Sequence, residues 1–505
     1  MCNDILNIRK LSVCTSDGNN ILKDISIKVP RGRIVGIVGP SGCGKTVLLK
    51  SIVGLAADNL ETRAEEIMFD EKNLCELSEK ELCDIRGMDI SLILQDPLPS
   101  LDPLMKIGVQ VEEALKIHTN ISGNDARKQA VEMLERVGLD DAESRYDCYP
   151  HELSGGQRQR VLLAASMILT PKLLLADEPT TALDISVEDG ILELMRDMCE
   201  EHDTSILYIT HNLRNIRKIC DRVYIMRDGE IVEEGATEEV LSHPENSFTK
   251  ELLEAESELY GVAKSSANTC AGVSIGSEAL VSCRHLYKTY NIDKGKSINA
   301  LHDVSLDIFR GEVLGLSGDS GCGKTTLART IMNLQKPDSG TVCFDGVNIT
   351  GMGAKNFSPY RRRMQMVFQE SYSSLDPKMT VMDIIAEPLL AYRLCNSKDE
   401  LKNRVLELLD ETGLDREHLY MYPHMLSGGQ RQRVNIARSI ALSPELIVCD
   451  EPVSSLDVAV IPKILDLFRS LKEKHHMTYL FISHDEKLLE SISDRIITMT
   501  YGRLE

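Results

Sequence analysis

Residues 33–55 read RIVGIVGPSGCGKTVLLKSIVGL, in which a glycine-rich turn separates a short apolar run from a helical pattern. The turn, Gly39–Thr46, fits the spacing G-x-x-x-x-G-K-[ST]. Its glycines let consecutive backbone N–H groups point at phosphate oxygens, and the next helix adds its positive N-terminus. The lysine of this motif reaches the β and γ phosphates, and the hydroxyl binds Mg²⁺. The stretch therefore predicts a nucleotide-binding α/β domain.

The same arrangement recurs later in the chain. Residues 312–334 read EVLGLSGDSGCGKTTLARTIMNL and contain a second turn of the same spacing. Two matches, each after an apolar run and before a helical pattern, argue against chance, because glycine makes up only about 7% of average sequences. The expected phosphate-binding residues are Gly39, Pro40, Ser41, Gly42, Cys43, Gly44, Lys45 and Thr46, and then Gly318, Asp319, Ser320, Gly321, Cys322, Gly323, Lys324, Thr325 and Thr326.

The repeat extends over most of the 505 residues. The octapeptide LSGGQRQR occurs at 153–160 and again, 273 residues later, at 426–433, whereas the two phosphate motifs lie 279 residues apart. Such drift is typical of surface loops, which tolerate insertions. We expect two domains, 1–252 and 279–505, joined by a linker, 253–278. Much of the linker, GVAKSSANTCAGVSIGSE, is rich in Gly, Ser and Ala and indicates a flexible tether.

Apolar runs and helical patterns alternate within each half. The runs LLLAD and SILYIT have counterparts in LIVCD and TYLFIS. Continuous apolar strands separated by helices indicate a parallel sheet covered on both faces. The segments between Gln95 and Ser154, and between Gln369 and Ser427, have helical periodicity instead, as in NDARKQAVEMLERVG and KDELKNRVLELLDETG. The expected fold class is α/β, with two tandem P-loop NTPase domains, each with an inserted helical subdomain.

Composition limits the possible partners. The net charge of −21 argues against broad binding to a nucleic-acid backbone, which needs a basic surface. The fourteen cysteines include no C-x-x-C pair, which favours reduced thiols over metal ligands. The N-terminal MCNDILNIRK lacks the apolar core of a signal peptide, and no apolar run reaches about 18 residues. We therefore expect any membrane role to depend on partner subunits.

Acidic pairs and single histidines follow the later strands. Asp177 and Glu178 end one strand, and Asp450 and Glu451 end its counterpart. The first acid of such a pair holds Mg²⁺, and the second can act as general base toward an attacking water. His211 and His484 each follow a further strand, 33 residues after the glutamate of the same half. An isolated acid pair or histidine is usually an ordinary surface feature, but the repeated order predicts catalytic glutamates and histidines that contact the γ-phosphate.

The SGGQ portion of the octapeptide fits the capping box S-x-x-Q at the start of a helix. A cap alone does not need two glycines, each about 1 kcal/mol less favourable than alanine in a helix interior. A helix N-terminus that approaches phosphate closely does need them, since glycine leaves the N–H groups uncovered. The expected second phosphate-binding surfaces are Ser154, Gly155, Gly156 and Gln157, and Ser427, Gly428, Gly429 and Gln430.

The ordered set of phosphate loop, Gln, LSGGQ, Asp-Glu and His resembles the nucleotide-binding domain of ABC transporters over nearly all of both halves. The resemblance implies ATP and Mg²⁺ as cofactors and two domains that pair head to tail within the chain. One site would join Gly39–Thr46 to Ser427–Gly429, and the other Gly318–Thr325 to Ser154–Gly156. The metal would be held by Thr46, Gln95 and Asp177, and by Thr325, Gln369 and Asp450.

The resemblance also assigns roles outside the phosphate motifs. Gln95 and Gln369 would relay ATP occupancy to a transmembrane partner, and Asp184 and Asp457 would cross the interface between the domains. Tyr290 is placed to stack on adenine, whereas the matching residue of the first half, Thr15, is not aromatic and departs from the family's pattern. Both halves keep a Lys, a Glu and a His, so both sites should hydrolyse ATP.

A finer resemblance follows each glutamine. The stretches LQDPLPSLDPLMKIG (94–108), FQESYSSLDPKMTVMDIIAEPL (368–389) and HPENSFTKELLEA (243–255) are similar to importers of dipeptides, oligopeptides and nickel. The resemblance implies an ATPase on the cytoplasmic face of the membrane, two permease subunits and an outside solute-binding protein. Peptide import is the first hypothesis, and import of nickel or another metal chelate is the alternative. A twin-ATPase translation factor is a rival from another class, but it usually has a long charged arm where 253–278 is short and not basic.

Overall fold

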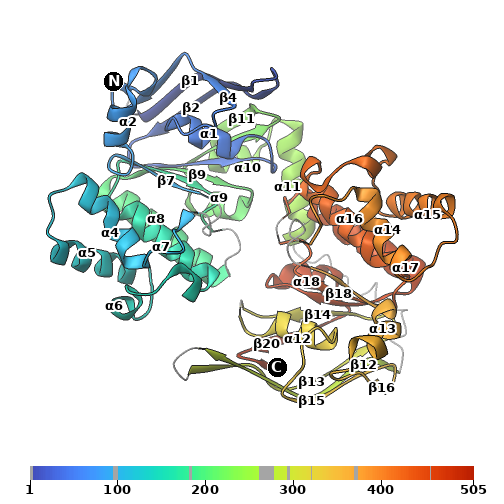
Figure 1. Ribbon diagram of the computed structural model, residues 1–505. Helices are drawn as coiled ribbons and strands as arrows, with labels where there is room; N and C mark the ends of the chain where they lie inside the picture. The colour runs from blue at the N-terminus through green and yellow to red at the C-terminus, as the bar shows by residue number, and fades with distance from the viewer. Residues whose placement is uncertain are drawn as a thin grey trace. The chain divides into compact units, whose positions relative to one another are not determined.

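The computed structural model describes residues 4–94, 100–180, 185–260, 278–292, 296–319, 321–368, 374–454 and 456–505. They form two compact units, Met1–Leu253 and Glu254–Glu505, which repeat one architecture (Figure 1). Of the predicted linker, residues 261–277 lie outside the described residues, and residues 253–260 belong to helix α11 (Ser247–Tyr260).

A mostly parallel sheet forms the centre of the first unit. Its spatial order is β11 (Glu230–Ala236), β10 (Arg222–Arg227), β3 (Ile34–Val38), β9 (Ser205–Thr210), β8 (Leu173–Asp177) and β7 (Ile90–Ile93). Every neighbouring pair is parallel except β10 and β11, which are antiparallel. Strands β3, β8 and β9 are buried along their whole length, as their continuous apolar runs predict. The α/β prediction is confirmed.

A second, antiparallel sheet was not predicted. It consists of β2 (Asn20–Pro30), β1 (Asp4–Thr15), β5 (Glu66–Phe69) and β6 (Lys72–Asn73), and β4 (Leu60–Arg63) pairs with the end of β1. Buried and exposed residues alternate along the second half of β2, so one face packs inward and the other meets solvent. Helix α1 (Lys45–Ile52) shares one apolar core with both sheets. This packing holds the first turn of α1 close to the carboxyl end of β3, with the loop 39–44 between them.

Helices complete the first unit and include the predicted helical insertion between β7 and β8. The insertion contains α4 (Ile107–His118), α5 (Gly123–Arg136), α6 (Ala142–Arg145), the 3₁₀ turn η2 (Pro150–Glu152) and α7 (Gly155–Met167). The other helical segments are η1 (Leu74–Glu76), α2 (Glu79–Ile85), α8 (Ile185–His202), α9 (Leu213–Ile219), α10 (Thr237–Ser242) and α11. In Figure 1 the antiparallel strands and helices α4–α7 lie on opposite sides of the parallel sheet.

The second unit repeats this strand order, but no strand among its described residues matches β4. Its parallel sheet has the order β17 (Met364–Val367), β18 (Leu446–Asp450), β19 (Thr478–Ile482), β14 (Val313–Ser317), β20 (Arg495–Thr500) and β21 (Arg503–Leu504). Its antiparallel sheet has the order β13 (Lys296–Phe309), β12 (Ala279–Ile292), β15 (Ser339–Phe344) and β16 (Val347–Asn348). Helix α12 (Lys324–Ile331) takes the place of α1 in a matching apolar core.

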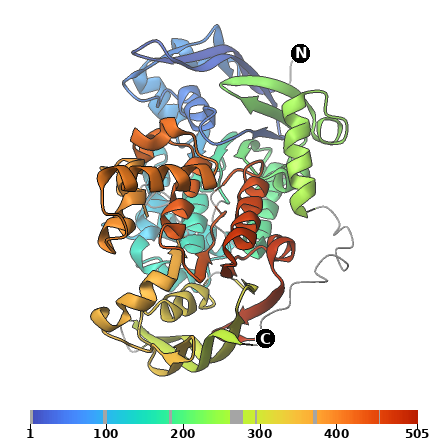
Figure 2. The ribbon, with the colours of Figure 1, turned by 90° about the vertical axis from the view of Figure 1, so that its right-hand side faces the viewer.

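The remaining helical segments of the second unit are α13 (Ala354–Arg363), α14 (Val381–Ala391), α15 (Lys398–Glu411), η3 (Arg416–Tyr420), η4 (Pro423–Met425), α16 (Gly428–Ile440), α17 (Ile461–His475) and α18 (Glu486–Ile492). Helices α14–α17 share a second core with the other face of the sheet. Figure 2 shows this layering within the unit, with the yellow-green antiparallel strands on one side and the orange helices on the other. Within the described part of the chain, no helix combines the length and hydropathy needed to span a membrane.

In each unit, a cluster of ion pairs connects the antiparallel sheet to the parallel sheet. At two matching positions of this cluster, the two units carry residues of opposite charge. In the first unit, Asp70 follows β5 and binds Arg31 and Lys172, with a Lys172 distance of 2.8 Å. Lys172 precedes β8 and also contacts Asp89, which precedes β7, at 3.2 Å. The two cations lower the pKa of Asp70 through hydrogen bonds.

In the second unit, Asp345 takes the place of Asp70 and binds Arg310 and Arg363. Glu445 precedes β18, where the first unit has a lysine, and it pairs with the same two arginines. Arg363 precedes β17, where the first unit has an aspartate. The pair next to the sheet has therefore exchanged its signs, Lys172–Asp89 becoming Glu445–Arg363. The arginines lower the pKa of both Asp345 and Glu445.

This exchange predicts how charge substitutions combine. Glu445→Lys brings a third cation to Arg310 and Arg363 and should destabilise the second unit by roughly 1–2 kcal/mol, more than an ordinary surface pair. The double variant Glu445→Lys, Arg363→Asp recreates the signs of the first unit and should recover most of that loss. Thermal unfolding of the full chain measures both effects, at about 2–4 °C per kcal/mol for a domain of this size. A double variant no more stable than the single one contradicts the exchange.

Candidate functional site

The predicted site residues of the first unit meet at the carboxyl edge of the parallel sheet. The phosphate loop Gly39–Thr46 follows β3, Asp177 ends β8, and His211 follows β9. These three strands are neighbours in the order β3, β9, β8. In open α/β sheets this edge is where ligands bind. The second unit arranges Gly318–Thr325, Asp450 and His484 in the same way around β14, β19 and β18.

The lysine of each phosphate loop folds back over the loop. Lys45 Nζ donates to the carbonyl oxygens of Gly39 at 2.7 Å and Pro40 at 3.0 Å, and Lys45 is only 6% exposed. Lys324 Nζ makes the matching bonds to Gly318 at 2.6 Å and Asp319 at 2.8 Å. The ammonium groups are therefore held against the loops on which phosphate would bind.

Glycine is required in the loop for two different reasons. Gly42 has φ +84°, a left-handed conformation that other residues rarely adopt, and nothing lies within 4 Å of the place a Cβ would take. Gly39, by contrast, has no room, because a Cβ would collide with the backbone carbonyl of Met226. Position 42 therefore requires glycine because of its left-handed backbone, and position 39 requires glycine because strand β10 lies too close for a side chain.

Two of the three predicted metal ligands of each unit, the threonine and the aspartate, lie side by side. Thr46 Oγ1 donates to Asp177 Oδ2 at 2.6 Å, and Thr325 Oγ1 donates to Asp450 Oδ1 at 3.3 Å. Asp177 is 1% exposed and Asp450 4% exposed. Burial raises the pKa of both carboxyl groups, and the threonine hydrogen bonds oppose that rise. A hydroxyl and a buried carboxylate are hard oxygen donors of the kind Mg²⁺ prefers, so the donor set fits that ion.

The glutamate that follows each metal-binding aspartate touches the histidine of the neighbouring strand. Glu178 Oε2 lies 3.1 Å from His211 Nδ1, and Glu451 Oε1 lies 3.5 Å from His484 Nδ1. The pairs link the end of β8 to the end of β9, and β18 to β19. The side chain of Glu178 is 5% exposed and that of Glu451 13% exposed. A carboxylate largely shielded from water beside an imidazole is suited to proton transfer.

The backbone of both glutamates is strained, which the sequence did not indicate. Glu178 has φ +45° and Glu451 has φ +47°, in the left-handed region that non-glycine residues seldom enter. Their N–H groups donate to the carbonyls of Ile209 at 2.9 Å and Ile482 at 3.0 Å, on the adjacent strands. Such strain is found where surrounding structure holds a functional residue in one orientation. The adjacent strand thus fixes the direction of each carboxylate.

The two SGGQ turns, Ser154–Gln157 and Ser427–Gln430, form the capping boxes that the sequence predicted. Ser154 Oγ accepts from Gln157 N at 3.3 Å, and Gln157 Oε1 accepts from Ser154 N at 3.1 Å. Among the described residues, nothing lies within 4 Å of a Cβ added to Gly155, whereas Leu456 lies 3.6 Å from a Cβ added to Gly428. The turns begin α7 and α16, in the helical subdomains.

Some predicted residues lie outside the described residues, namely Gln95, Asp184, Ser320 and Gln369. Tyr290 lies on β12, is 40% exposed and accepts a hydrogen bond from Gln335. Asp457 precedes α17, and its carbonyl accepts from Val460 N at 2.8 Å. Cys43 and Cys322 are buried under the phosphate loops. Roles that need both units, including those of the SGGQ turns and Asp457, remain predictions.

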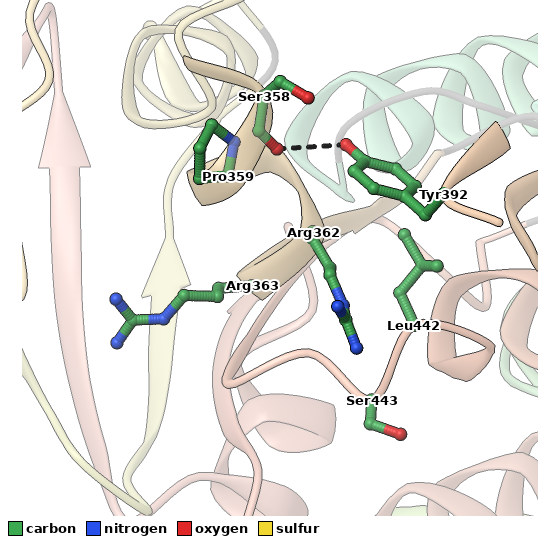
Figure 3. A pocket seen from close by; sticks show the side chains of 7 residues that line it. All are labelled: Ser358, Pro359, Arg362, Arg363, Tyr392, Leu442 and Ser443. Atoms are coloured by element: carbon green, nitrogen blue, oxygen red, sulfur yellow. Dashed lines mark hydrogen bonds between the residues drawn. The ribbon is translucent and has the colours of Figure 1, made fainter. Parts of the chain in front are cut away.

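A pocket of ≈ 720 Å³ in the first unit is lined by the metal-binding pair and by part of the helical subdomain. Its lining includes Thr46 and Asp177, and Gln110, Glu113 and Ile117 of α4. Figure 3 shows a pocket in the second unit, where the hydroxyl of Tyr392 donates to the carbonyl of Ser358 at 3.1 Å. Its lining residues are Ser358, Pro359, Arg362, Arg363, Tyr392, Leu442 and Ser443, none of which belongs to a predicted site.

The burial of Asp177 predicts how the stability of the first unit depends on pH. Its pKa in the folded chain is raised, so at neutral pH its desolvated charge destabilises the unit, and this cost disappears as the pH falls through the raised pKa. In EDTA, Asp177→Asn should raise the unfolding temperature at neutral pH by a few degrees, and the gain should shrink at acidic pH. The exposed variant Asp17→Asn is the control. A lower unfolding temperature for Asp177→Asn at neutral pH contradicts the prediction.

Comparison with known proteins agrees with the site geometry. The profile of the family described as ABC transporter matches residues 22–181 and 301–454. The peptidoglycan transport ATP-binding protein YejF of Agrobacterium fabrum is 39% identical over 99% of this chain and 92% of its own length. The glutathione import ATP-binding protein GsiA of Salmonella paratyphi A is 34% identical over 99% of this chain and 85% of its own.

Among solved structures, the dimeric MJ0796, described as a bacterial ABC transporter cassette, is 33% identical over 45% of this chain and 96% of its own, with a TM-score of 0.42. The family profile covers both phosphate loops and both acid pairs, and the relatives match nearly the whole chain. The chain therefore belongs to the ABC transporter family, as an ATP-binding ATPase with two such domains.

Proposed function

We propose that the chain energises an ABC importer of peptides by hydrolysing ATP at two composite sites. The observation that supports this most directly is the constellation of Lys, Thr, Asp, Glu and His, which recurs around three adjacent strands in each unit. Neither unit has lost a member of the set, which favours two working sites rather than one.

Each composite site would combine one phosphate loop with the SGGQ turn of the other unit. Gly39–Thr46 would face Ser427–Gly429, and Gly318–Thr325 would face Ser154–Gly156. The pairing is supported by the helix N-terminus at each SGGQ turn and, among the described residues, by the open space where a Cβ of Gly155 would lie. Tyr290 would stack on adenine at the second loop.

Hydrolysis would use the glutamates as general bases. Glu178 or Glu451 would take a proton from the attacking water while that oxygen bonds to the γ-phosphorus and the bond to ADP breaks with its electron pair on ADP. The adjacent histidine orients the carboxylate through its Nδ1. Thr46 and Asp177, with their counterparts in the second unit, would hold Mg²⁺, which when bound neutralises charge on the phosphates.

The proposed cargo is inferred from the names of two relatives and from the chemical nature of the solutes in those names. One relative is named for glutathione import and another for peptidoglycan transport. Glutathione is a tripeptide, and peptidoglycan contains short peptide stems, so both names point to peptide-containing solutes. Peptide import therefore remains the first hypothesis, with nickel or metal-chelate import as the alternative.

A permease subunit would dock on the first unit at the pocket lined by Thr46 and α4. Thr46 and Asp177 line this pocket together with residues of α4, so a helix bound there would respond to whether the phosphate site is filled. Ile117, which also lines the pocket, is 68% exposed and offers an apolar contact. This location would put the chain on the cytoplasmic face of the membrane as a peripheral subunit.

A capture experiment tests this function. The double variant Glu178→Gln, Glu451→Gln should hold ATP without hydrolysing it, and it should be captured with ATP from detergent-solubilised membranes. We expect two permease subunits in the captured material and far less of them from the wild-type chain with ADP. A co-captured solute-binding protein can then be titrated with peptides and with nickel chelates to decide the cargo. Recovery of ribosomal proteins without permeases would favour the translation-factor class instead.

A further inference from the structure

Within the described parts of the two units, the SGGQ turn of the second unit has a hydrogen-bonding partner that its counterpart does not have. Gln430 Nε2 lies 3.0 Å from Nε2 of His418, a residue of the 3₁₀ turn η3. At the matching position of the first unit the residue is Arg145, and the described hydrogen bonds of Gln157 are those to Ser154. The two turns have the same sequence, but their glutamine side chains make different contacts.

The hydrogen bonds of Gln430 decide which atoms face His418. Gln430 Oε1 accepts from the backbone N–H of Ser427 at 2.9 Å, so it is the capping oxygen of the turn. The amide must then present its NH₂ group to the imidazole. His418 Nε2 is accordingly an acceptor, and a neutral imidazole in that role carries its proton on Nδ1.

Both backbone groups of Asp415 face the other ring nitrogen of His418. The Asp415 N–H is placed to donate to His418 Nδ1 at 3.0 Å, as in the capping box of η3, and the Asp415 carbonyl oxygen lies 3.1 Å from the same nitrogen. The contact with Gln430 selects the tautomer with its proton on Nδ1, which donates to the carbonyl of Asp415 in place of accepting from its N–H. The hydrogen bond between Gln430 and His418 connects the SGGQ turn to η3.

We propose that His418 is a positioning residue for ATP hydrolysis, which holds the SGGQ turn of the second unit in the orientation that engages phosphate. The proposal rests on the composite sites proposed above, in which Ser427–Gly429 completes the site of the first phosphate loop. His418 would act on the reaction through Gln430. The hydrolysis site that uses Glu178 then depends on His418, whereas the site that uses Glu451 does not.

The experiment compares His418→Leu in two backgrounds, each with one working site. In the Glu451→Gln background only Glu178 can act, and there His418→Leu should lower kcat roughly three- to tenfold, the equivalent of one lost hydrogen bond of about 0.7–1.4 kcal/mol. The KM for ATP should change little, because ATP meets the phosphate loop before the SGGQ turn closes on it. In the Glu178→Gln background the same substitution should leave kcat unchanged.

Two further variants distinguish positioning from general stability. His418→Gln keeps an acceptor within reach of Gln430 and should restore most of kcat, whereas a purely structural role would not depend on an acceptor. Arg145→Leu, at the matching position of the first unit, is the control and should change kcat in neither background. If one glutamate substitution silences both sites, vanadate trapping of 8-azido-ADP in the otherwise wild-type chain reports the two sites separately, because it labels a site only after hydrolysis there. The site at Gly39–Thr46 alone should then lose label in His418→Leu.

The outcomes separate this inference from the proposed function. Equal kcat with and without His418→Leu in both backgrounds overturns the role of His418. A loss in the Glu178→Gln background alone keeps that role but overturns the head-to-tail pairing. A loss in both backgrounds, with no rescue by His418→Gln, assigns His418 to general stability and overturns the inference.

Discussion

The double variant Glu178→Gln, Glu451→Gln should bind ATP normally and hydrolyse it at least about 100 times more slowly than the wild-type chain. Glutamine has nearly the shape of glutamate, so the strained backbone at φ +45° and +47° and the contacts to Ile209 and Ile482 can persist. What disappears is the carboxylate that accepts a proton. Phosphate release measures the rate, and equilibrium titration with labelled ATP measures binding.

The matched control for this prediction is Glu238→Gln, Glu490→Gln, which changes one exposed helical glutamate in each unit. It should retain full activity. If the active-site double variant hydrolyses ATP at the wild-type rate, a different group is the general base. If it no longer binds ATP, the glutamates shape the nucleotide site rather than the reaction.

Substituting one phosphate-loop lysine should remove one of two nucleotide sites. Lys45→Met keeps the buried apolar stem but removes the ammonium that bonds to Gly39 and Pro40. A lost charged contact to phosphate in a shielded site should weaken ATP binding there by about 100-fold, or about 2.7 kcal/mol. The second site, with Lys324, should be unaffected.

Titration calorimetry with a non-hydrolysable ATP analogue tests this stoichiometry. We expect two sites per chain in the wild type, one in Lys45→Met, one in Lys324→Met and none in the double variant. Lys23→Ala, which removes only an exposed ion pair with Glu230, is the control and should retain two sites. A single lysine substitution that abolishes all binding would show that the two sites fill only together.

The catalytic edge could be predicted because its residues follow strands with a strong pattern. Asp177 and His211 each end or follow a fully buried strand, and parallel strands place such ends together. The same reasoning placed Lys45 and Thr46 after β3. Comparison of the two halves strengthened each assignment, since the order of the motifs is preserved. These features depend on local pattern and topology alone.

Other features depend on contacts between distant segments, which no local pattern reveals. The left-handed backbone of Glu178 follows from its bond to Ile209, on another strand, and glutamate is not a residue type that indicates positive φ. His418 could not be recognised because its importance lies in a single contact with Gln430. The antiparallel sheet could have been found, because ISIKV in β2 alternates apolar and polar residues.

The exchanged ion pairs have a consequence for how the chain folds. A chain with two similar units can assemble wrongly, with an edge strand of one unit added to the sheet of the other. Strands β7 and β17 are such edges. If β7 paired with β18, Asp89 would meet Glu445, and if β17 paired with β8, Arg363 would meet Lys172. Each wrong assembly therefore places like charges together, and each correct one places opposite charges together. During folding, this charge pattern disfavours strand pairing between the two units and favours pairing within each unit.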